Sequence, residues 1–328
     1  MNILVTGGAG YIGSHCVKTL LKTYPEENVT VIDNLSEGHR DAVLTSKFYE
    51  CDLRDKGHLR NVFRKESIEA VIHFAAFASV PESVASPHKY YENNIVGSLN
   101  LLEAMLESNV KKLIFSSSAS VYGEPISEFI DEEHPKVPKN PYGHSKLIIE
   151  EILKWYYTAY KINSISFRYF CAAGADPEGM IGERHNTETH SIPSAILTAL
   201  GKRETFYVYG NDYNTKDGSG VRDYIHVNDL VDAHIKALEV IDENTCDQMN
   251  LGIGKGYTVF DIVNTVKKLT GKQFNVKIAE RRAGDPSVLI AKPDKAFKYL
   301  NWKPKYTELE DIIESALKFF RLHLNPHL

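Results

Sequence analysis

Tyr142 and Lys146 are the two side chains whose types and spacing best suit acid–base chemistry. They lie four residues apart directly after Pro141, where a helical pattern begins, so on a helix their side chains share one face. A lysine ammonium beside a phenol favours the phenolate and lowers a pKa that is ordinarily about 10. We therefore predict that Tyr142 is a general base and that Lys146 lowers its pKa.

Spacing alone does not select this pair. Three Tyr–Lys pairs share it: Tyr142/Lys146, Tyr157/Lys161 and Tyr299/Lys303. For the other two pairs we expect exposed or packing roles. What distinguishes Tyr142 is the strand pattern at residues 112–115 and the run Ser116-Ser117-Ser118 that follows it. Turn chemistry accounts for Ser116 and Ser117, whereas we assign Ser118 to the reacting site at the carboxyl edge of the predicted sheet.

The first 33 residues predict a strand, a glycine turn, a helix and a second strand that together hold a dinucleotide. Gly7 permits the tight turn out of the strand, Gly10 lets the backbone approach a pyrophosphate, and Gly13 lets the helix pack on the sheet. The helix N-terminus presents free N–H groups to the phosphates. Asp33 lies where a carboxylate accepts hydrogen bonds from an adenosine ribose and repels a 2′-phosphate, which favours NAD over NADP.

A glycine triplet by itself is more often a loop, so its context decides. Here GxxGxxG directly follows an apolar run at residues 3–5. A second cluster, at Gly252, Gly254 and Gly256, lacks the third, helix-packing glycine, and we interpret it as a turn.

Strand patterns alternate with helical patterns, which predicts a Rossmann-type doubly wound parallel α/β sheet. The strand patterns lie at residues 2–6, 29–33, 69–74 and 111–116, and long amphipathic helices are predicted at 88–108 and 141–161. The broad apolar faces of these two helices indicate either packing within the subunit or a homodimer interface.

Residues 171–220 are rich in Gly, Asn, Asp, Thr and Tyr with few regular apolar periods, which is typical of a binding surface. Helical patterns return at 226–241, 258–270 and 307–322. We predict an NAD-binding domain of residues 1–170 plus about 226–250, and a smaller mixed α/β substrate-binding lobe of residues 171–225 and 251–328. The lobe should lie over the carboxyl edge of the sheet.

Composition excludes several classes of function. The 328-residue chain is 43% hydrophobic and 25% charged with a net charge of −5, so nucleic acid and anionic membranes are poor partners. No apolar run is long enough to span a membrane, and we expect no signal peptide. The four cysteines are scattered, which favours free thiols in the cytoplasm. We predict no metal site.

Along nearly its whole length, the chain resembles the extended short-chain dehydrogenase/reductase family. The stretches that carry the resemblance are residues 5–15 (VTGGAGYIGSH), 33–35 (DNL), 73–76 (HFAA), 115–123 (FSSSASVYG), 141–146 (PYGHSK), 168–170 (RYF), 210–213 (GNDY), 220–227 (GVRDYIHV) and 281–285 (RRAGD). Within that family it is similar to the enzymes that interconvert UDP-glucose and UDP-galactose.

The resemblance implies roles for residues at three places. Tyr142 is the base, Lys146 orients the nicotinamide ribose, and Ser118 hydrogen-bonds the reacting hydroxyl. The residues implied to surround NAD are Gly7, Gly10, Tyr11, Ile12, Gly13, Asp33, Asn34, Asp52, Leu53, Phe74, Ala75, Ala76, Asn93, Tyr142, Lys146 and Phe170. Those implied to contact the UDP-sugar are Ser118, Tyr142, Cys171, His190, Ser191, Tyr207, Tyr209, Arg222, Arg282, Asp285 and Leu289. The fixed fork of arginine suits bidentate diphosphate binding.

Three residues depart from the family pattern. Cys171 stands where many members have Asn, Ala78 stands where some have a lysine, and Leu289 occupies the position that relates to sugar size. Leu289 is intermediate between the large aromatic and the small residues found there, so N-acetylhexosamines stay open as substrates.

The implied reaction is redox-neutral inversion at sugar C4: oxidation, rotation of the 4-keto sugar, and hydride return to the other face. Alternatives are UDP-xylose/UDP-arabinose 4-epimerisation, sugar-nucleotide 4,6-dehydration and UDP-glucuronate decarboxylation. Ala119-Ser120 after Ser118 supply no carboxylate, which argues against both lyases. A non-catalytic NAD-binding scaffold would be expected to lose Tyr142.

Overall fold

A parallel seven-stranded sheet forms the centre of the computed structural model, which describes residues 1–185, 188–282 and 284–324. Its spatial order is β11-β7-β5-β4-β1-β2-β3, and every neighbouring pair is parallel. The strands are β1 (Ile3–Thr6), β2 (Val29–Asp33), β3 (Phe48–Glu50), β4 (Ala70–His73), β5 (Lys112–Ser118), β7 (Asn163–Tyr169) and β11 (Cys246–Leu251).

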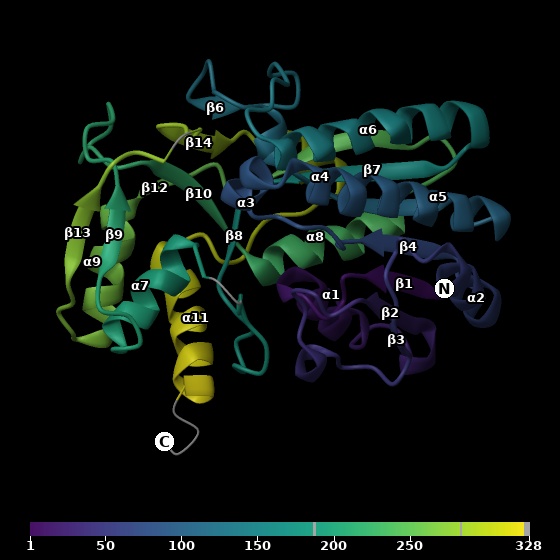
Figure 1. Cartoon of the computed structure of the whole chain (residues 1–328), viewed down its shortest axis with the longest axis horizontal. Coiled ribbons are helices and arrows are strands. Elements are labelled where there is room, and N and C mark those ends of the chain that lie inside the picture. Colours follow the sequence, from purple (N-terminus) through teal and green to yellow (C-terminus); the bar gives the residue numbers. More distant parts are fainter. Residues whose placement is uncertain (186–187, 283, 325–328) are drawn as a thin grey trace.

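Helices cover both faces of this sheet (Figure 1). Ile3 and Val5 of β1 pack with α1 (Tyr11–Leu20) and α8 (Val227–Val240) on one face, whereas Leu4 packs on the other face. That other face is covered by α2 (Lys56–Glu66), α5 (Gly97–Glu107) and α6 (Pro141–Tyr160). Alternate side chains of a strand point to opposite faces, so a strand buried on both sides reads as a continuous apolar run. The predicted doubly wound fold is confirmed.

Strand β5 extends further than the sequence predicted. Ser116, Ser117 and Ser118 continue the strand and pair in register with Phe167, Arg168 and Tyr169 of β7. The turn role expected for Ser116 and Ser117 is therefore wrong. Three hydroxyl residues are compatible with a strand here because tertiary partners satisfy them: Ser117 Oγ donates to Glu150 Oε1 at 2.6 Å.

The helix expected at residues 88–108 forms as three consecutive pieces. They are α4 (Pro87–Tyr90), a π-helical turn at Tyr91–Val96 and α5, and a short helix, α3 (Val80–Ala85), precedes them. Turns of π-helix are frequent at functional sites, and this one carries Asn93.

A second group of elements lies at the far side of Figure 1 from β1, β2 and β3. Strands β12 (Gly256–Thr258), β10 (Val221–His226), β14 (Val288–Ala291) and β6 (Phe129–Ile130) form one sheet, β8 (Cys171–Ala173) pairs with β10, and β9 (Phe206–Tyr209) pairs with β13 (Val276–Ala279). They pack with α7 (Ser191–Ala199), α9 (Val259–Thr270) and α11 (Leu309–Leu324). A further helix, α10 (Asp294–Tyr299), contributes Ala296 to the core against α1 and α8.

The sequence did not predict α7. Its residues SIPSAILTA are buried on nearly all sides, so they show no amphipathic period. The turn interpretation of the second glycine cluster is confirmed, because Gly254 takes a positive φ of 74° between β11 and β12. Among the described residues, no helix combines the length and apolar character that crossing a membrane requires.

Candidate active site

Ser118, Tyr142 and Lys146 meet at the carboxyl end of β5. Helix α6 begins at Pro141 because Asn140 caps it, accepting a hydrogen bond from Gly143 N at 2.8 Å. One turn on, Lys146 Nζ donates to Ser116 O at 2.6 Å and lies 5.9 Å from the centre of the Tyr142 ring. The side chain of Ser118 lies beside the Tyr142 phenol, where it favours the phenolate. The three residues predicted to do chemistry therefore share one site.

The electrostatics of this site differ from the prediction. Burial raises the pKa of Tyr142, and the Ser118 side chain opposes that rise. Burial also lowers the pKa of Lys146 to about 7, against the attraction of Glu150. The charge of the lysine alone would favour the phenolate. Enclosure in the protein, however, disfavours both charged forms, the phenolate and the ammonium. The predicted lowering of the Tyr142 pKa by Lys146 is wrong for the chain by itself.

The glycine turn after β1 has the close packing that a pyrophosphate site needs. Gly7 takes a φ of 72°, and a Cβ atom on it would lie 2.7 Å from Ala75 N; a Cβ atom on Gly13 would lie 2.1 Å from Gly7 O. Asp33 accepts hydrogen bonds from Ala9 N at 3.0 Å and Leu35 N at 2.8 Å, so it holds this turn in place. These two glycines let the turn, the helix and the residues after β4 pack closely, whereas a Cβ atom on Gly10 would have only Gly7 O within 4 Å, at 3.3 Å. The residues present therefore fit a dinucleotide, because the backbone at Gly10 is open to its approach.

The other predicted NAD residues lie at the same edge of the sheet, after the carboxyl ends of their strands. Asn34 Nδ2 donates to Asp52 Oδ2 at 2.9 Å, joining the loops after β2 and β3. Phe74, directly after β4, packs against His234 with ring centres 5.0 Å apart. Phe170, directly after β7, is buried. Asn93 donates to Asn94 Oδ1 at 3.1 Å. This edge is where ligands bind open α/β sheets.

His73, at the end of β4, is a core histidine whose ring nitrogens both have partners. Its ring nitrogens pair with Thr6 Oγ1 at 2.7 Å and with Ser98 Oγ at 2.8 Å. Burial lowers the pKa of this imidazole to about 3, so it stays neutral.

Strand β10 brings several predicted substrate residues together. Arg222 is in register with Leu289 of β14, and its Nη2 lies 3.9 Å from Asp285 Oδ1. Tyr224 of the same strand is in register with Cys171 of β8. Leu289 also packs in a cluster with Ala119, Leu147 and Phe170, next to the catalytic candidates. Strand β14 therefore packs against the residues that directly follow Ser118 and Lys146.

The remaining predicted substrate residues form a second group. Tyr207 and Tyr209 lie exposed on the same side of β9, and the Arg282 guanidinium stacks 3.9 Å above the centre of the Tyr209 ring. Ser191 begins α7, and its side chain partly opposes the rise that burial causes in the pKa of Tyr224. His190 precedes α7, and its Nδ1 pairs with Glu183. Ala283, part of the motif at 281–285, lies outside the described residues.

Sequence reasoning missed residues that hold the site together. The carboxylate of Asp223 is fully buried and accepts hydrogen bonds from Ile253 N, Gly254 N and Ala291 N, which joins β10, the glycine turn and β14. Glu150 of α6 pairs with Arg168 of β7. A charged residue inside an otherwise apolar strand pattern was the available signal for Arg168.

Comparison with known proteins identifies the family. A family model described as "NAD dependent epimerase/dehydratase family" matches residues 3–252. The chain belongs to this family. It is 48% identical over 325 residues to a curated relative from Lacticaseibacillus casei named UDP-glucose 4-epimerase, with 98% of each chain covered.

Solved structures agree with the curated relatives. A crystal structure described as UDP-glucose 4-epimerase is 48% identical, has a TM-score of 0.94 and covers 98% of each chain. The UDP-glucose 4-epimerase from Bifidobacterium longum, in complex with NAD+ and UDP, is 39% identical with a TM-score of 0.93 and 99% of each chain covered. The family resemblance found in the motifs is confirmed.

Proposed function

We propose that this chain interconverts UDP-glucose and UDP-galactose by NAD-dependent epimerisation at sugar C4. The observation that carries the proposal is the convergence at one sheet edge of Ser118, Tyr142 and Lys146, next to the glycine turn and across from Arg222 and Leu289. The relatives in the comparison carry the same activity in their names.

In the proposed reaction, the Tyr142 phenolate takes the proton of the sugar 4-hydroxyl, directly or through Ser118, and returns a proton after inversion. Bound NAD supplies the acceptor for the C4 hydride and gives the hydride back. Burial raises the pKa of Tyr142, so the phenolate needs compensation, and the neighbouring Ser118 side chain provides part of it.

Rotation of the 4-keto sugar requires a firmly held nucleotide and a loosely held hexose. We assign the diphosphate and its ribose to Arg222, Arg282 and Asp285, and the uracil to the exposed face of Tyr207 and Tyr209. The sugar end is bordered by apolar Leu289 and Phe170. Apolar walls without fixed donors leave the ring free to turn, which supports epimerisation over a reaction with one binding mode.

The residue after Ser118 is Ala119, which carries no carboxylate and is buried in the apolar cluster with Leu289 and Phe170. An eliminating enzyme needs an acid there, so the dehydratase and decarboxylase alternatives are disfavoured. UDP-xylose/UDP-arabinose and UDP-N-acetylhexosamines require the same chemistry, and we propose that Leu289 sets how well they fit.

We also propose a homodimer through α6 and the helical run that ends in α5. Trp155 on α6 is 72% exposed and Val96, just before α5, is 43% exposed, although both belong to helices with apolar faces. Large apolar side chains left in water on neighbouring helices are typical of subunit interfaces. The free thiols of all four cysteines support a cytoplasmic location.

The two-domain division predicted from the sequence is likewise proposed. Two elements after residue 225 support it: β11 pairs with β7 in the large sheet, and α8 packs on one face of that sheet. The 171–225 segment packs instead with α9 and α11.

The function is tested with purified protein, UDP-galactose and no added cofactor, with UDP-glucose measured by chromatography. We expect conversion in both directions. Tyr142→Phe should lower turnover by about 10²–10⁴-fold or more with NAD still bound, because the phenolic proton carrier is lost. Unchanged turnover in Tyr142→Phe, or release of a 4-keto-6-deoxy sugar, would overturn the proposal.

A further inference from the structure

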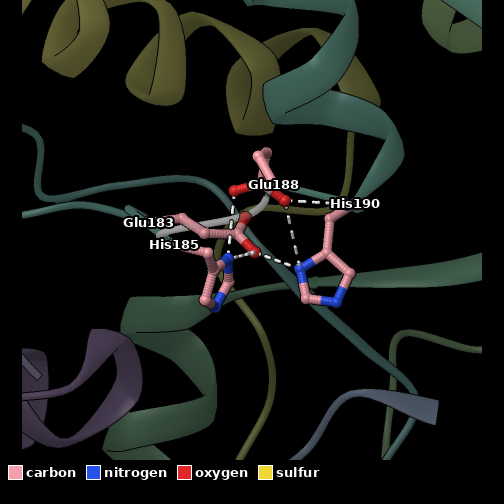
Figure 2. Close-up of side chains that lie close together, drawn as sticks. All are labelled: Glu183, His185, Glu188 and His190. Atoms are coloured by element: carbon pink, nitrogen blue, oxygen red, sulfur yellow. Dashed lines mark hydrogen bonds and ion pairs between the residues drawn. The ribbon is translucent and has the colours of Figure 1, made fainter. Parts of the chain in front are cut away.

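Four side chains with metal-ligating atoms converge in the segment between β8 and α7. They are Glu183, His185, Glu188 and His190, and one donor atom from each lies within 4.8 Å of all the others (Figure 2). None of them takes part in the proton transfer proposed for Tyr142 and Ser118, although His190 is also one of the residues predicted to contact the UDP-sugar.

The distances between the donor atoms suit a small tetrahedral ion. His185 Nδ1 lies 3.0 Å from Glu188 Oε2 and 3.6 Å from Glu183 Oε1, and His190 Nδ1 lies 3.8 Å from Glu188 Oε1. Four ligands at zinc bond lengths of about 2.0–2.2 Å are about 3.4 Å apart. The contact between His185 and Glu188 and the closer contact between His190 and Glu183 must both lengthen to admit an ion.

The chemistry of the donors narrows the choice of ion. Two imidazole nitrogens and two carboxylate oxygens, with no sulfur and no carbonyl cage, match zinc better than calcium or magnesium. The Glu183 and Glu188 side chains are only 4% and 6% exposed, and two buried carboxylates call for two positive charges. One divalent cation supplies both charges and leaves the two histidine nitrogens free to act as ligands. We propose that Glu183, His185, Glu188 and His190 bind one zinc ion in a closed, structural site.

Neighbouring contacts fix these ligands and suggest what the ion does. Glu188 Oε1 accepts from His190 N at 2.7 Å, and Arg203 Nη2 donates to Glu188 O at 2.6 Å. On the other side, His39 Nε2 donates to Arg184 O at 3.0 Å. Arg184 therefore contacts the loop after β2 and Glu188 contacts Arg203, shortly after α7, so this cluster lies where the two parts of the structure cross. A zinc ion would fasten this crossing, because it ties both ends of the segment to one point.

The test uses full-length protein without an affinity tag, treated with a chelator, reloaded with ZnCl2 and desalted. Zinc per chain is measured by mass spectrometry of the metal, and thermal unfolding is recorded with and without zinc. We expect about one zinc per chain, with a higher melting temperature, in the wild type. We expect loss of both effects in His185→Asn and Glu188→Gln. His88→Asn is the matched control, because His88 forms a similar but exposed pair with Glu92 at 3.3 Å.

Cobalt substitution keeps the proposal falsifiable if the variants fail to fold. Wild-type protein loaded with Co2+ should show the intense visible absorption of a tetrahedral site. Absence of that absorption, no retained zinc in the wild type, or equal zinc in wild type and His185→Asn would overturn the proposal, and equal zinc would mean an adventitious ion only. The readouts do not involve epimerisation, so failure here and failure of the proposed function are separate results.

Discussion

Glu150→Gln tests whether a buried ion pair holds the catalytic helix on the sheet. Glu150 lies one turn after Lys146 in α6, and its side chain and that of Arg168 are 0% and 1% exposed. Its Oε1 accepts from Ser117 Oγ at 2.6 Å and Arg168 Nε at 3.0 Å, and its Oε2 accepts from Arg168 Nη2 at 2.6 Å. The pair therefore joins α6 to both β5 and β7.

The cost of the substitution follows from these contacts. Glutamine keeps one oxygen for Ser117 and Arg168 Nε but turns an NH2 group toward Arg168 Nη2, so one charge-assisted hydrogen bond, typically about 1.5–3 kcal/mol, is replaced by a donor–donor contact. The guanidinium also stays buried without its counter-charge. We expect the free energy of unfolding to fall by about 3–5 kcal/mol, the range for removing one partner of a buried pair.

Urea denaturation followed by fluorescence measures this loss. Glu151→Gln is the matched control, because Glu151 is exposed on the same helix and pairs with Lys154. The control should lose less than about 1 kcal/mol, the range for exposed ion pairs. A double variant with Leu at 150 and Met at 168 should recover much of the loss, since apolar replacement of both partners removes the unpaired charge. A loss in Glu150→Gln no larger than in Glu151→Gln would refute the reasoning.

Three further predictions address the cofactor turn, the lysine and the dimer. Gly13→Ala places a Cβ atom 2.1 Å from Gly7 O, and overpacking of this kind costs about 1–3 kcal/mol, so the NAD retained per chain should fall about tenfold or more. Gly57→Ala is the control, because the nearest atom to a Cβ there lies 3.5 Å away. Equal NAD absorbance in the two variants would contradict this prediction. The pKa of Lys146 is lowered to about 7 against about 10.4 when unfolded, so the folded chain binds fewer protons in this window and its stability rises with pH, by up to about 1.4 kcal/mol per unit. The unfolding free energy of wild type minus that of Lys146→Met should therefore increase from pH 7 to 9, and a flat difference would show that the lysine is not desolvated. Trp155→Glu should yield monomers in sedimentation velocity. Leu322→Glu is the control, because Leu322 is an exposed apolar residue on α11, and this variant should remain a dimer. If both variants are dimers, the interface lies elsewhere.

The long elements and the first βαβ unit could be predicted because their signals are local. Strands β1, β2 and β4 and helices α6, α8, α9 and α11 form within a few residues of their predicted bounds. Each depends on a hydrophobic period or a capping residue that the chain carries within a few positions. Helix α7 could not be found this way, because its nearly complete burial removes the period.

The short distance between Tyr142 and Lys146 was set by the sequence, since two residues that are four positions apart on a helix share a face. So was the glycine turn, whose three glycines, at two equal spacings, serve one loop and one helix. Only the tertiary structure decided the protonation behaviour of these groups, because burial depends on everything packed around them. It alone also placed Leu289 beside Arg222, Asp223 beneath the second glycine turn, and two histidines against two buried glutamates. These contacts join residues of different strands and segments, and they depend on strand register and tertiary packing. Neither produces a hydrophobic period or a local motif in the sequence.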